Sequence, residues 1–280
     1  MSVFVSAAEL NERIQTGQKQ TIIAALWEPE EGKAWAKFQS EHIPTALYCD
    51  PSVQLAGMPG RSVGRNPMPS ISTVRKAAAG WGVEEGRPVY VYDGGNGLFA
   101  ARAWWILRWA GVSDVHILDG GFAAWDGEGL PTVAGPGGVI VPREVELSEG
   151  HLPAASMEDV RAFEGLLIDA RGARRFEGRR EILDLRAGHI PGAQNLPVYE
   201  LFDEQTHKVK DSDTVRDRFA QLGITHNTDP AGAITYSGSG NHSALLLAAL
   251  EHVDLPLLTH YVGGWSQWSG NRDNPVATHI

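Results

Sequence analysis

The sequence predicts an α/β protein made of two tandem copies of one domain. Short apolar runs alternate with helical patterns along the chain, and several motifs of the first half recur in the second half in the same order. Strands separated by helices usually pair in parallel. Each copy is therefore expected to hold a mainly parallel sheet flanked by helices.

The duplication is carried by motifs that recur at nearly constant spacing. A His-Ile-Pro segment, a tyrosine before a glycine-rich loop, and a glycine pair before an aromatic segment each occur twice. These motif pairs begin at His42 and His189, at Tyr92 and Tyr236, and at Asp119 and Val262. The seam is expected within the Gly/Pro/Val-rich stretch 133–153, which gives domains at 1–140 and 141–280.

Each predicted strand is a short apolar run. The runs of the first half are 21–26, 46–49, 89–92 and 115–118, with a helical pattern at 100–109. Those of the second half are 166–170, 194–196, 233–236 and 258–261, with the matching helix at 243–250. Ser6 and Ser156 each precede an acidic residue by three positions, which predicts two helix N-caps of the capping-box type.

Composition excludes several classes of protein. The 280 residues carry a net charge of −10, which disfavours partners such as nucleic acid or an anionic membrane. A single cysteine, Cys49, excludes an internal disulfide framework and fits a reducing compartment. No apolar run approaches a membrane span of about 20 residues, and 1–5 leads into a helix start rather than a signal peptide. A cytoplasmic protein without metal or cofactor is expected.

The loop after the predicted strand 233–236 is the strongest functional signal. It runs Ser237-Gly238-Ser239-Gly240-Asn241-His242 and opens a helical pattern. A glycine-rich turn between a strand and a helix directs backbone N–H groups toward one point, which suits an anion or a thiolate. Ser237 stands at the mouth of this loop and determines its chemistry. The first copy carries Asp93 at the corresponding place and is expected to be inactive.

Three other loop chemistries fit poorly. The string from Gly95 to Ala100 matches a dinucleotide fingerprint, but the second copy does not keep the pattern. Ser237 and Ser239 both lack the glycine spacing of a hydrolase elbow. A phosphatase loop needs an arginine after its nucleophile, and 237–247 contains none.

At this point the chain resembles the tandem-domain sulfurtransferases of the rhodanese superfamily over nearly its whole length. The resemblance is carried by the His-Ile-Pro segments, the glycine–tryptophan motifs and the closing Asn274-Pro275-Val276-Ala277. The loop Gly238-Ser239-Gly240 is most similar to the 3-mercaptopyruvate branch. The thiosulfate branch usually has an arginine where Gly238 stands.

The resemblance implies transfer of sulfane sulfur from a small anionic donor, 3-mercaptopyruvate or thiosulfate, to a thiol or cyanide acceptor through a persulfide. It places the catalytic positions at Ser237, Ser239 and His42. The substrate-binding residues that it implies are Arg175, Gly238, Gly240, Asn241 and His242. Arg175 is the best substrate arginine, since the planar guanidinium suits a carboxylate.

Two departures from the family pattern affect the predicted activity. Family loops begin with cysteine, and a serine at 237 cannot form a persulfide, so transfer is expected to be impaired. Ser237 is either natural or introduced, and both fit the sequence. The relay implied by the resemblance also lacks its aspartate, because Ala24 occupies that place while the second copy keeps Asp169.

These departures leave other functions open. The alternatives are a non-catalytic anion-binding or regulatory module and, less favoured, a serine-dependent hydrolase that uses His42 or His242 as its base. His42 acts either as a proton shuttle or, like His189, as part of a turn before proline. For His242, a position facing solvent in the first helical turn is favoured over a base for Ser237. The segment 51–69 is long for a connection and is expected to cover a cleft between the domains.

Overall fold

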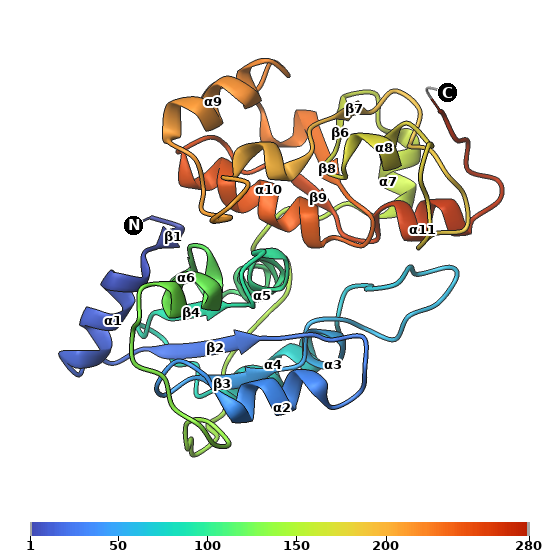
Figure 1. Ribbon diagram of the computed structural model, residues 1–280. Coiled ribbons are helices and arrows are strands. Elements are labelled where there is room, and N and C mark those ends of the chain that lie inside the picture. The colour runs from blue at the N-terminus through green and yellow to red at the C-terminus, as the bar shows by residue number, and fades with distance from the viewer. Residues whose placement is uncertain (1, 279–280) are drawn as a thin grey trace. The chain divides into compact units, whose positions relative to one another are not determined.

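A computed structural model describes residues 2–278 and divides the chain into two compact units. Unit 1 comprises the described residues up to Leu55, together with Pro69–His151 and Gln205–Val209. Unit 2 comprises Ala56–Met68, Leu152–Glu204 and the described residues from Lys210 onward. Each unit contains one parallel sheet flanked by helices, so the predicted fold class is confirmed (Figure 1).

Unit 1 has a five-stranded parallel sheet with the strand order β1-β5-β4-β2-β3. Its strands are β1 (Phe4–Val5), β2 (Thr21–Ala25), β3 (Leu47–Cys49), β4 (Val89–Tyr92) and β5 (Val115–Leu118). Its helices are α1 (Ala7–Gln15), α2 (Lys33–Ser40), α3 (Pro51–Gln54), α4 (Ile71–Gly80), α5 (Leu98–Trp109) and α6 (Gly121–Gly127). The two-residue strand β1 had no counterpart among the predicted apolar runs.

Unit 2 has a four-stranded parallel sheet with the order β7-β6-β8-β9. Its strands are β6 (Leu166–Asp169), β7 (Gln194–Asn195), β8 (Ala233–Tyr236) and β9 (Thr259–Tyr261). Its helices are α7 (Met157–Ala162), α8 (Ala173–Phe176), α9 (Ser212–Ala220), α10 (Asn241–His252) and α11 (Gly264–Gly270), with 3-10 turns η1 (Val198–Leu201) and η2 (Pro230–Gly232).

Both predicted capping boxes are present and begin the first helix of each copy. Ser6 Oγ accepts a hydrogen bond from the Glu9 N–H, and the Glu9 carboxylate accepts one from the Ser6 N–H. Ser156 and Asp159 form the same reciprocal pair before α7. Each box satisfies backbone donors that the first helical turn leaves without partners.

Helices α5 and α10 are the most deeply buried of their units, and this burial fixes the loops that precede them. Nine residues of each helix are buried, and Trp104 and Trp105 of α5 are among the fully buried side chains. A helix that is apolar on nearly all sides belongs inside a core. The loop at the start of α10 is therefore held on one side by β8 and on the other by a buried helix.

The segment Ala56–Met68, which we call the strap, packs within unit 2 although it comes from the first half of the sequence. The Arg65 N–H donates to Ser266 Oγ of α11 at 3.1 Å. The approach is close because Gly64 has φ +89°, and a Cβ there would lie 2.7 Å from Ser266 Oγ. The strap therefore contributes residues 65 and 66 to the surroundings of the second loop.

Within residues 2–278, no helix is long and apolar enough to cross a membrane.

Candidate active site

The site of unit 2 is built around the loop that joins β8 to α10. Ser237 directly follows β8 and is completely buried, and Gly240 caps α10 with φ +88°. The Gly240 N–H donates to Ser237 Oγ at 3.2 Å. Ser237 Oγ also lies 3.1 Å from Ser243 Oγ, in the first turn of α10. The side chain at position 237 is therefore held inside the loop by a backbone donor and a neighbouring hydroxyl.

Helix α11 holds the loop through its backbone carbonyls. The Trp265 N–H donates to the Ser237 carbonyl at 2.7 Å, and the Ser266 N–H donates to the Gly238 carbonyl at 2.8 Å. Gly264 makes this approach possible, because it has φ +55° and a Cβ there would lie only 2.3 Å from the Ser237 carbonyl oxygen. Any side chain at 264 would push α11 away from the loop.

Two guanidinium groups lie beside Gly238. A Cβ on this glycine would be 3.0 Å from Arg65 Nη2 and 3.3 Å from Arg175 Nη1. Arg175 is the substrate arginine expected from the sequence. Arg65 was not expected, because it comes from the strap, far from the loop in sequence. Its neighbour Asn66 donates through Nδ2 to Ser239 Oγ at 3.0 Å, which orients the second serine of the loop.

Buried carboxylates hold these arginines in position. Arg175 Nη2 pairs with Glu181 at 2.9 Å and with Asp184 at 2.8 Å. Arg65 also pairs with Asp184. Arg171 is fully buried and forms a bidentate pair with Asp169, with Nη2 2.6 Å from Oδ2. The network fixes both guanidinium planes near the loop, which prepares them for a planar anion.

The protonation of this network follows from burial and pairing. Burial alone would raise the pKa of Glu181, but hydrogen bonds from the Leu183 N–H and from Arg175 lower it. Burial raises the pKa of Asp184 despite the opposing effect of Arg65. Burial likewise lowers the pKa of Arg65. Glu181 is thus held more firmly in its charged form than Asp184.

The other arginines near position 175 have structural or surface roles. Arg186 donates to the backbone carbonyls of Trp268, Ser269, Asn271 and Asn274 at the end of α11. Arg174, Arg179 and Arg180 are exposed. Surface charge, the ordinary role of arginine, therefore accounts for these three.

His242 lies in the first turn of α10, half-buried, with its ring edge-on to Tyr199 and the two ring centroids 5.7 Å apart. The expectation that it simply faces solvent is therefore wrong. Burial and the neighbouring Arg175 lower the pKa of His242 to about 4. The imidazole is consequently neutral near neutral pH.

His42 of unit 1 and His189 of unit 2 occupy identical settings. His42 Nδ1 is 2.7 Å from the Phe38 carbonyl oxygen, and its ring stacks on Phe38. His189 Nδ1 is 2.7 Å from the Phe176 carbonyl oxygen, and its ring stacks on Phe176. Both histidines also pair through their backbones with a later segment. This shared geometry favours a turn-forming role, while the catalytic role of His42 stays a prediction.

The corresponding loop in unit 1 is filled by its own side chain. The Asp93 carboxylate accepts hydrogen bonds from four backbone N–H groups at 2.9 to 3.3 Å, from Gly95, Gly97, Phe99 and Ala100. These four donors converge on the Asp93 carboxylate; burial raises the pKa of this group, and the hydrogen bonds oppose that shift. The anion in unit 1 is part of the chain itself.

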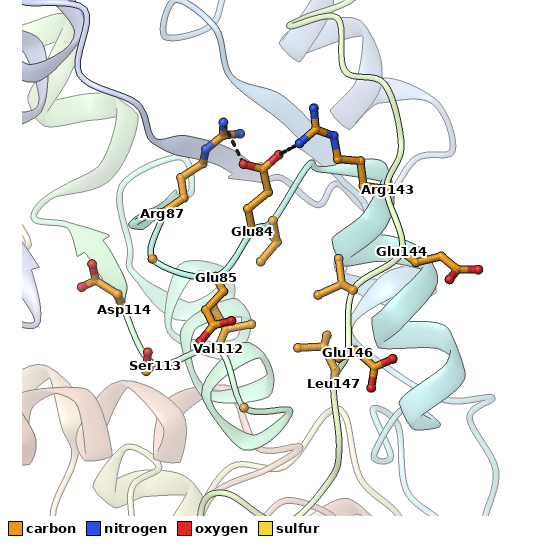
Figure 2. Close-up of a pocket in the computed structure, with 14 residues that line it drawn as sticks. Glu84, Glu85, Arg87, Val112, Ser113, Asp114, Arg143, Glu144, Glu146 and Leu147 are labelled. Atoms are coloured by element: carbon orange, nitrogen blue, oxygen red, sulfur yellow. Dashed lines mark hydrogen bonds and ion pairs between the residues drawn. The ribbon is translucent and has the colours of Figure 1, made fainter.

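Unit 1 also has a surface pocket that contains none of the expected site residues. It is lined by 83–87, 111–114 and 143–147. Figure 2 shows Glu84 between Arg87 and Arg143, with Arg87 Nη2 3.1 Å and Arg143 Nη1 2.9 Å from its carboxylate oxygens. Glu84, Arg87 and Arg143 neutralise one another through these ion pairs, so we assign no function to this pocket.

Cys49 does not supply the missing thiol. It is fully buried at the end of β3, and burial raises the pKa of its thiol well above the ordinary range. A thiol that stays protonated is a poor nucleophile. Among residues 2–278, no group of three or more histidine, cysteine or acidic side chains is arranged to hold a metal ion.

Comparison with known proteins also finds two copies of one domain, each containing one of the two loops. A family model described as a rhodanese-like domain matches residues 6–128 and again residues 147–271. The chain belongs to the rhodanese family. The two matches repeat the internal duplication seen in the sequence.

Relatives within the rhodanese family are named as sulfurtransferases. A Pseudomonas aeruginosa protein named probable 3-mercaptopyruvate sulfurtransferase is 36% identical, with 91% of this chain and 89% of the relative covered. The 3-mercaptopyruvate sulfurtransferase of Escherichia coli K12 is 34% identical, with 98% and 97% covered. By resemblance to such proteins, this rhodanese-family chain is a sulfurtransferase.

Solved structures share the fold. The structure of the Escherichia coli 3-mercaptopyruvate sulfurtransferase matches with a TM-score of 0.79 and 32% identity, over 95% of this chain and 100% of that one. The 3-mercaptopyruvate sulfurtransferase of Leishmania major matches with a TM-score of 0.84 over 96% of this chain and 74% of that one. Its identity is 24%, so it supports the fold alone.

Proposed function

We propose that unit 2 binds a small anionic sulfur donor, 3-mercaptopyruvate or thiosulfate, at the mouth of the Ser237 loop. In a complete enzyme of this design, a cysteine thiolate at position 237 would attack the donor's transferable sulfur and form a persulfide, as the bond to that sulfur breaks and pyruvate leaves 3-mercaptopyruvate or sulfite leaves thiosulfate. The persulfide would then pass the sulfur to a thiol or to cyanide. With serine at that position, the chain is proposed to bind the donor without carrying sulfur through this loop.

The observation that carries the proposal is the pair of guanidinium groups beside Gly238. Arg65 and Arg175 lie within 3.0 and 3.3 Å of the place where a Cβ of Gly238 would be. A side chain at 238 would separate the loop from these cations. Glycine leaves them beside position 238 of the loop, where the carboxylate of 3-mercaptopyruvate could pair with a planar guanidinium.

The serine limits the chemistry for an elementary reason. A thiolate attacks sulfane sulfur because sulfur is polarisable and its thiol ionises near neutral pH. A hydroxyl ionises far less readily and needs a positioned base before it attacks any electrophile. An oxygen at this position also cannot hold the persulfide through which the sulfur would pass.

Ser239 is proposed to assist the reaction, because Asn66 orients its hydroxyl at the loop mouth. Gly240, Asn241 and His242 are proposed to border the bound donor, since they form the start of α10. The case for His42 is weaker, because His189 has the same contacts in a copy where it is not assigned catalysis.

The test is sulfur transfer to cyanide from each donor, with Ser237→Cys compared with the chain as it stands. We expect the variant to turn over at least about 10³-fold faster, since loss of a catalytic nucleophile costs that order or more. Asp93→Cys is the matched control, because it puts a cysteine at the corresponding place in the other loop. It is expected to remain inactive.

Turnover by Asp93→Cys, or none by a folded Ser237→Cys variant, would overturn the assignment of unit 2 as the active copy. The preferred donor of the active variant would distinguish the 3-mercaptopyruvate branch from the thiosulfate branch.

A second candidate is a binding module that keeps the anion site without catalysis. It is favoured by the complete burial of Ser237 and by the hydrogen bonds that hold its hydroxyl within the loop. Calorimetric binding of 3-mercaptopyruvate to a Ser237→Cys variant that does not turn over would support this function over the first.

A further inference from the structure

A chain of three buried polar side chains lies beneath the loop of unit 2. Ser237 Oγ is 3.1 Å from Ser243 Oγ, and Ser243 Oγ is 2.7 Å from His260 Nε2. His260 belongs to β9 and Ser243 to α10, and all three side chains are 1% exposed or less. The contact between Ser243 and His260 is the shorter of the two, and Ser243 is its donor when the imidazole carries its proton on Nδ1.

The donors and acceptors in this chain permit protons to move from position 237 toward His260 when His260 Nε2 is the acceptor. Ser237 Oγ already accepts the Gly240 N–H, so its own proton can be donated to Ser243 Oγ. Ser243 has one proton and two acceptors within reach, His260 Nε2 at 2.7 Å and the Gly240 carbonyl at 3.2 Å. Donation to His260 completes a path along which protons move from position 237 toward the imidazole.

The first copy shows that the fold does not require these polar groups. Helices α5 and α10 both follow a capping glycine, Gly97 and Gly240. The third residue of each helix is Ala100 in α5 and Ser243 in α10. Both positions are buried, so the same place in the fold accepts an apolar side chain.

The strand partner differs in the same way. In unit 1, Ile117 pairs with Val91, the residue before Tyr92. In unit 2, His260 pairs with Thr235, the residue before Tyr236. The buried apolar pair Ala100 and Ile117 thus corresponds to a buried polar pair in the second copy. Burying a hydroxyl and an imidazole costs free energy that an apolar pair would not, which points to a role other than packing.

We propose that Ser243 and His260 form a proton relay that accepts the proton of the side chain at position 237. His260 is a positioning residue that acts through Ser243, and it is the final acceptor. Neither a sulfur donor nor sulfur transfer is needed for this step, so the relay goes beyond the function proposed above.

The step conserves protons and involves no oxidation. The O–H bond of Ser237 breaks as its proton passes to Ser243 Oγ, and the O–H bond of Ser243 breaks as its proton passes to His260 Nε2. The products are an anion at position 237 and an imidazolium at 260. A hydroxyl would lose its proton only while attacking an electrophile, whereas a thiol at 237 would form a stable thiolate–imidazolium pair.

Other groups around the loop also affect ionisation at position 237, and the test has to hold them constant. The charged and titratable groups are Arg65, Arg171, Arg175, Asp169, Glu181, Asp184, His242, Tyr236 and Tyr261. None of them is changed by substitution of Ser243 or His260.

The experiment follows the ultraviolet absorbance of the thiolate in Ser237→Cys as a function of pH, with the parent chain subtracted. Burial raises the pKa of Cys49 well above the ordinary range, and burial also raises the pKa values of Tyr236 and Tyr261. The difference signal near neutral pH therefore reports position 237 alone. We expect a thiol pKa below the ordinary value of about 8.5.

Adding Ser243→Ala to Ser237→Cys is expected to raise that thiol pKa by about one unit or more, a tenfold or larger loss of thiolate near neutral pH. The pair Ser243→Ala with His260→Leu should do the same, and it resembles the apolar pair that unit 1 already accommodates. Ser269→Ala is the matched control, because it removes another buried serine of unit 2 and should leave the pKa unchanged.

An unchanged thiol pKa in both relay variants, with their circular dichroism intact, would overturn the proposal. So would an equal shift in the Ser269→Ala control, since that would show a general response to loss of a buried hydroxyl. Sulfur transfer is not measured in this experiment, so failure of the relay and failure of the sulfurtransferase proposal are distinguishable.

Discussion

The two glycine-rich loops of this chain each join a strand to a buried helix, but they differ in the side chain that their backbone N–H groups contact. In unit 1, the Asp93 carboxylate takes four backbone N–H donors. In unit 2, Ser237 Oγ accepts one backbone hydrogen bond, from the Gly240 N–H, and its other contact is with Ser243 Oγ. Both loops are also held by a bond from the second helix after them: the Phe122 N–H of α6 donates to the Asp93 carbonyl, and the Trp265 N–H of α11 donates to the Ser237 carbonyl.

The difference shows how one fold gives a structural loop and a functional loop. A carboxylate that fills the donors stabilises the turn and leaves no room for an external anion. A small neutral side chain such as that of Ser237 accepts fewer of these hydrogen bonds and leaves room for an external anion. The cations that would pair with such an anion then come from other segments. In unit 2 they come from α8 and the strap, as Arg175 and Arg65.

The largest expected effect that tests this comparison is on stability. Asp93→Ala leaves four N–H groups without their acceptor, two of them in the buried residues Gly95 and Ala100. We expect a loss of about 3 kcal/mol or more in the free energy of unfolding, because each unsatisfied buried donor costs about 1–3 kcal/mol. Ser237→Ala removes one acceptor and is expected to cost about 1 kcal/mol. Chemical denaturation measures both.

Equal costs for the two variants would contradict the view that only the first loop is filled by its own anion. Amide hydrogen exchange of β4 and α5 provides a second measurement. It should increase in Asp93→Ala and remain unchanged in Ser237→Ala.

The second test uses the pH dependence of the free energy of unfolding, to which Asp119 of unit 1 and His242 of unit 2 contribute with opposite sign. Burial raises the pKa of Asp119, which follows β5, to about 6, against the lowering effect of a hydrogen bond from the Val209 N–H. Between about pH 4 and this value, the folded state keeps a proton that the unfolded state has lost. Stability from Asp119 therefore falls as pH rises through that window, by on the order of 2 kcal/mol. Val262 occupies the corresponding place in unit 2 and does not titrate.

In unit 2, His242 gives the reverse slope. The pKa of His242 is lowered to about 4 by burial and by Arg175. Below about pH 6.5 the unfolded imidazole gains a proton that the folded one does not, so stability from His242 is lost as pH falls, again by on the order of 2 kcal/mol. We measure the free energy of unfolding by chemical denaturation between pH 4 and 7. Relative to the parent chain, it should rise more steeply with pH in Asp119→Asn and less steeply in His242→Gln. Parallel curves would show that neither group is perturbed as described.

The sequence predicted the parts of this molecule that depend on local pattern. Strands β4, β5 and β8 have the bounds expected from their apolar runs, and both capping boxes formed, because three-residue spacing alone determines them. The family was identified from the same kind of local motif. Position 237 was recognised because loop, strand and helix are contiguous there.

Residues that meet only through the fold could not be predicted. Arg65 and Asn66 come from the strap, and nothing in their own segment indicates that it packs beside α11. Ser243 was included in an apolar helical pattern, and His260 in an apolar strand. Their contact needs the register of β8 with β9, which no short-range pattern specifies. The half-buried setting of His242 likewise depends on Tyr199, a distant residue.

The smallest expected effect tests the role of the strap in the second loop. Arg65→Ala removes one of the two guanidinium groups beside Gly238, so affinity for 3-mercaptopyruvate is expected to fall about tenfold, the order of one charge-assisted hydrogen bond. Arg61→Ala is the matched control, since Arg61 also lies on the strap but donates to the Gly270 carbonyl at 3.2 Å. Calorimetry measures both affinities. If the two variants lose affinity equally, the strap matters only for packing and the second loop has a single arginine for its anion. If Arg65 alone matters, a segment distant in sequence gives the second loop a cation for an external anion, whereas the donors of the first loop are already occupied by the Asp93 carboxylate.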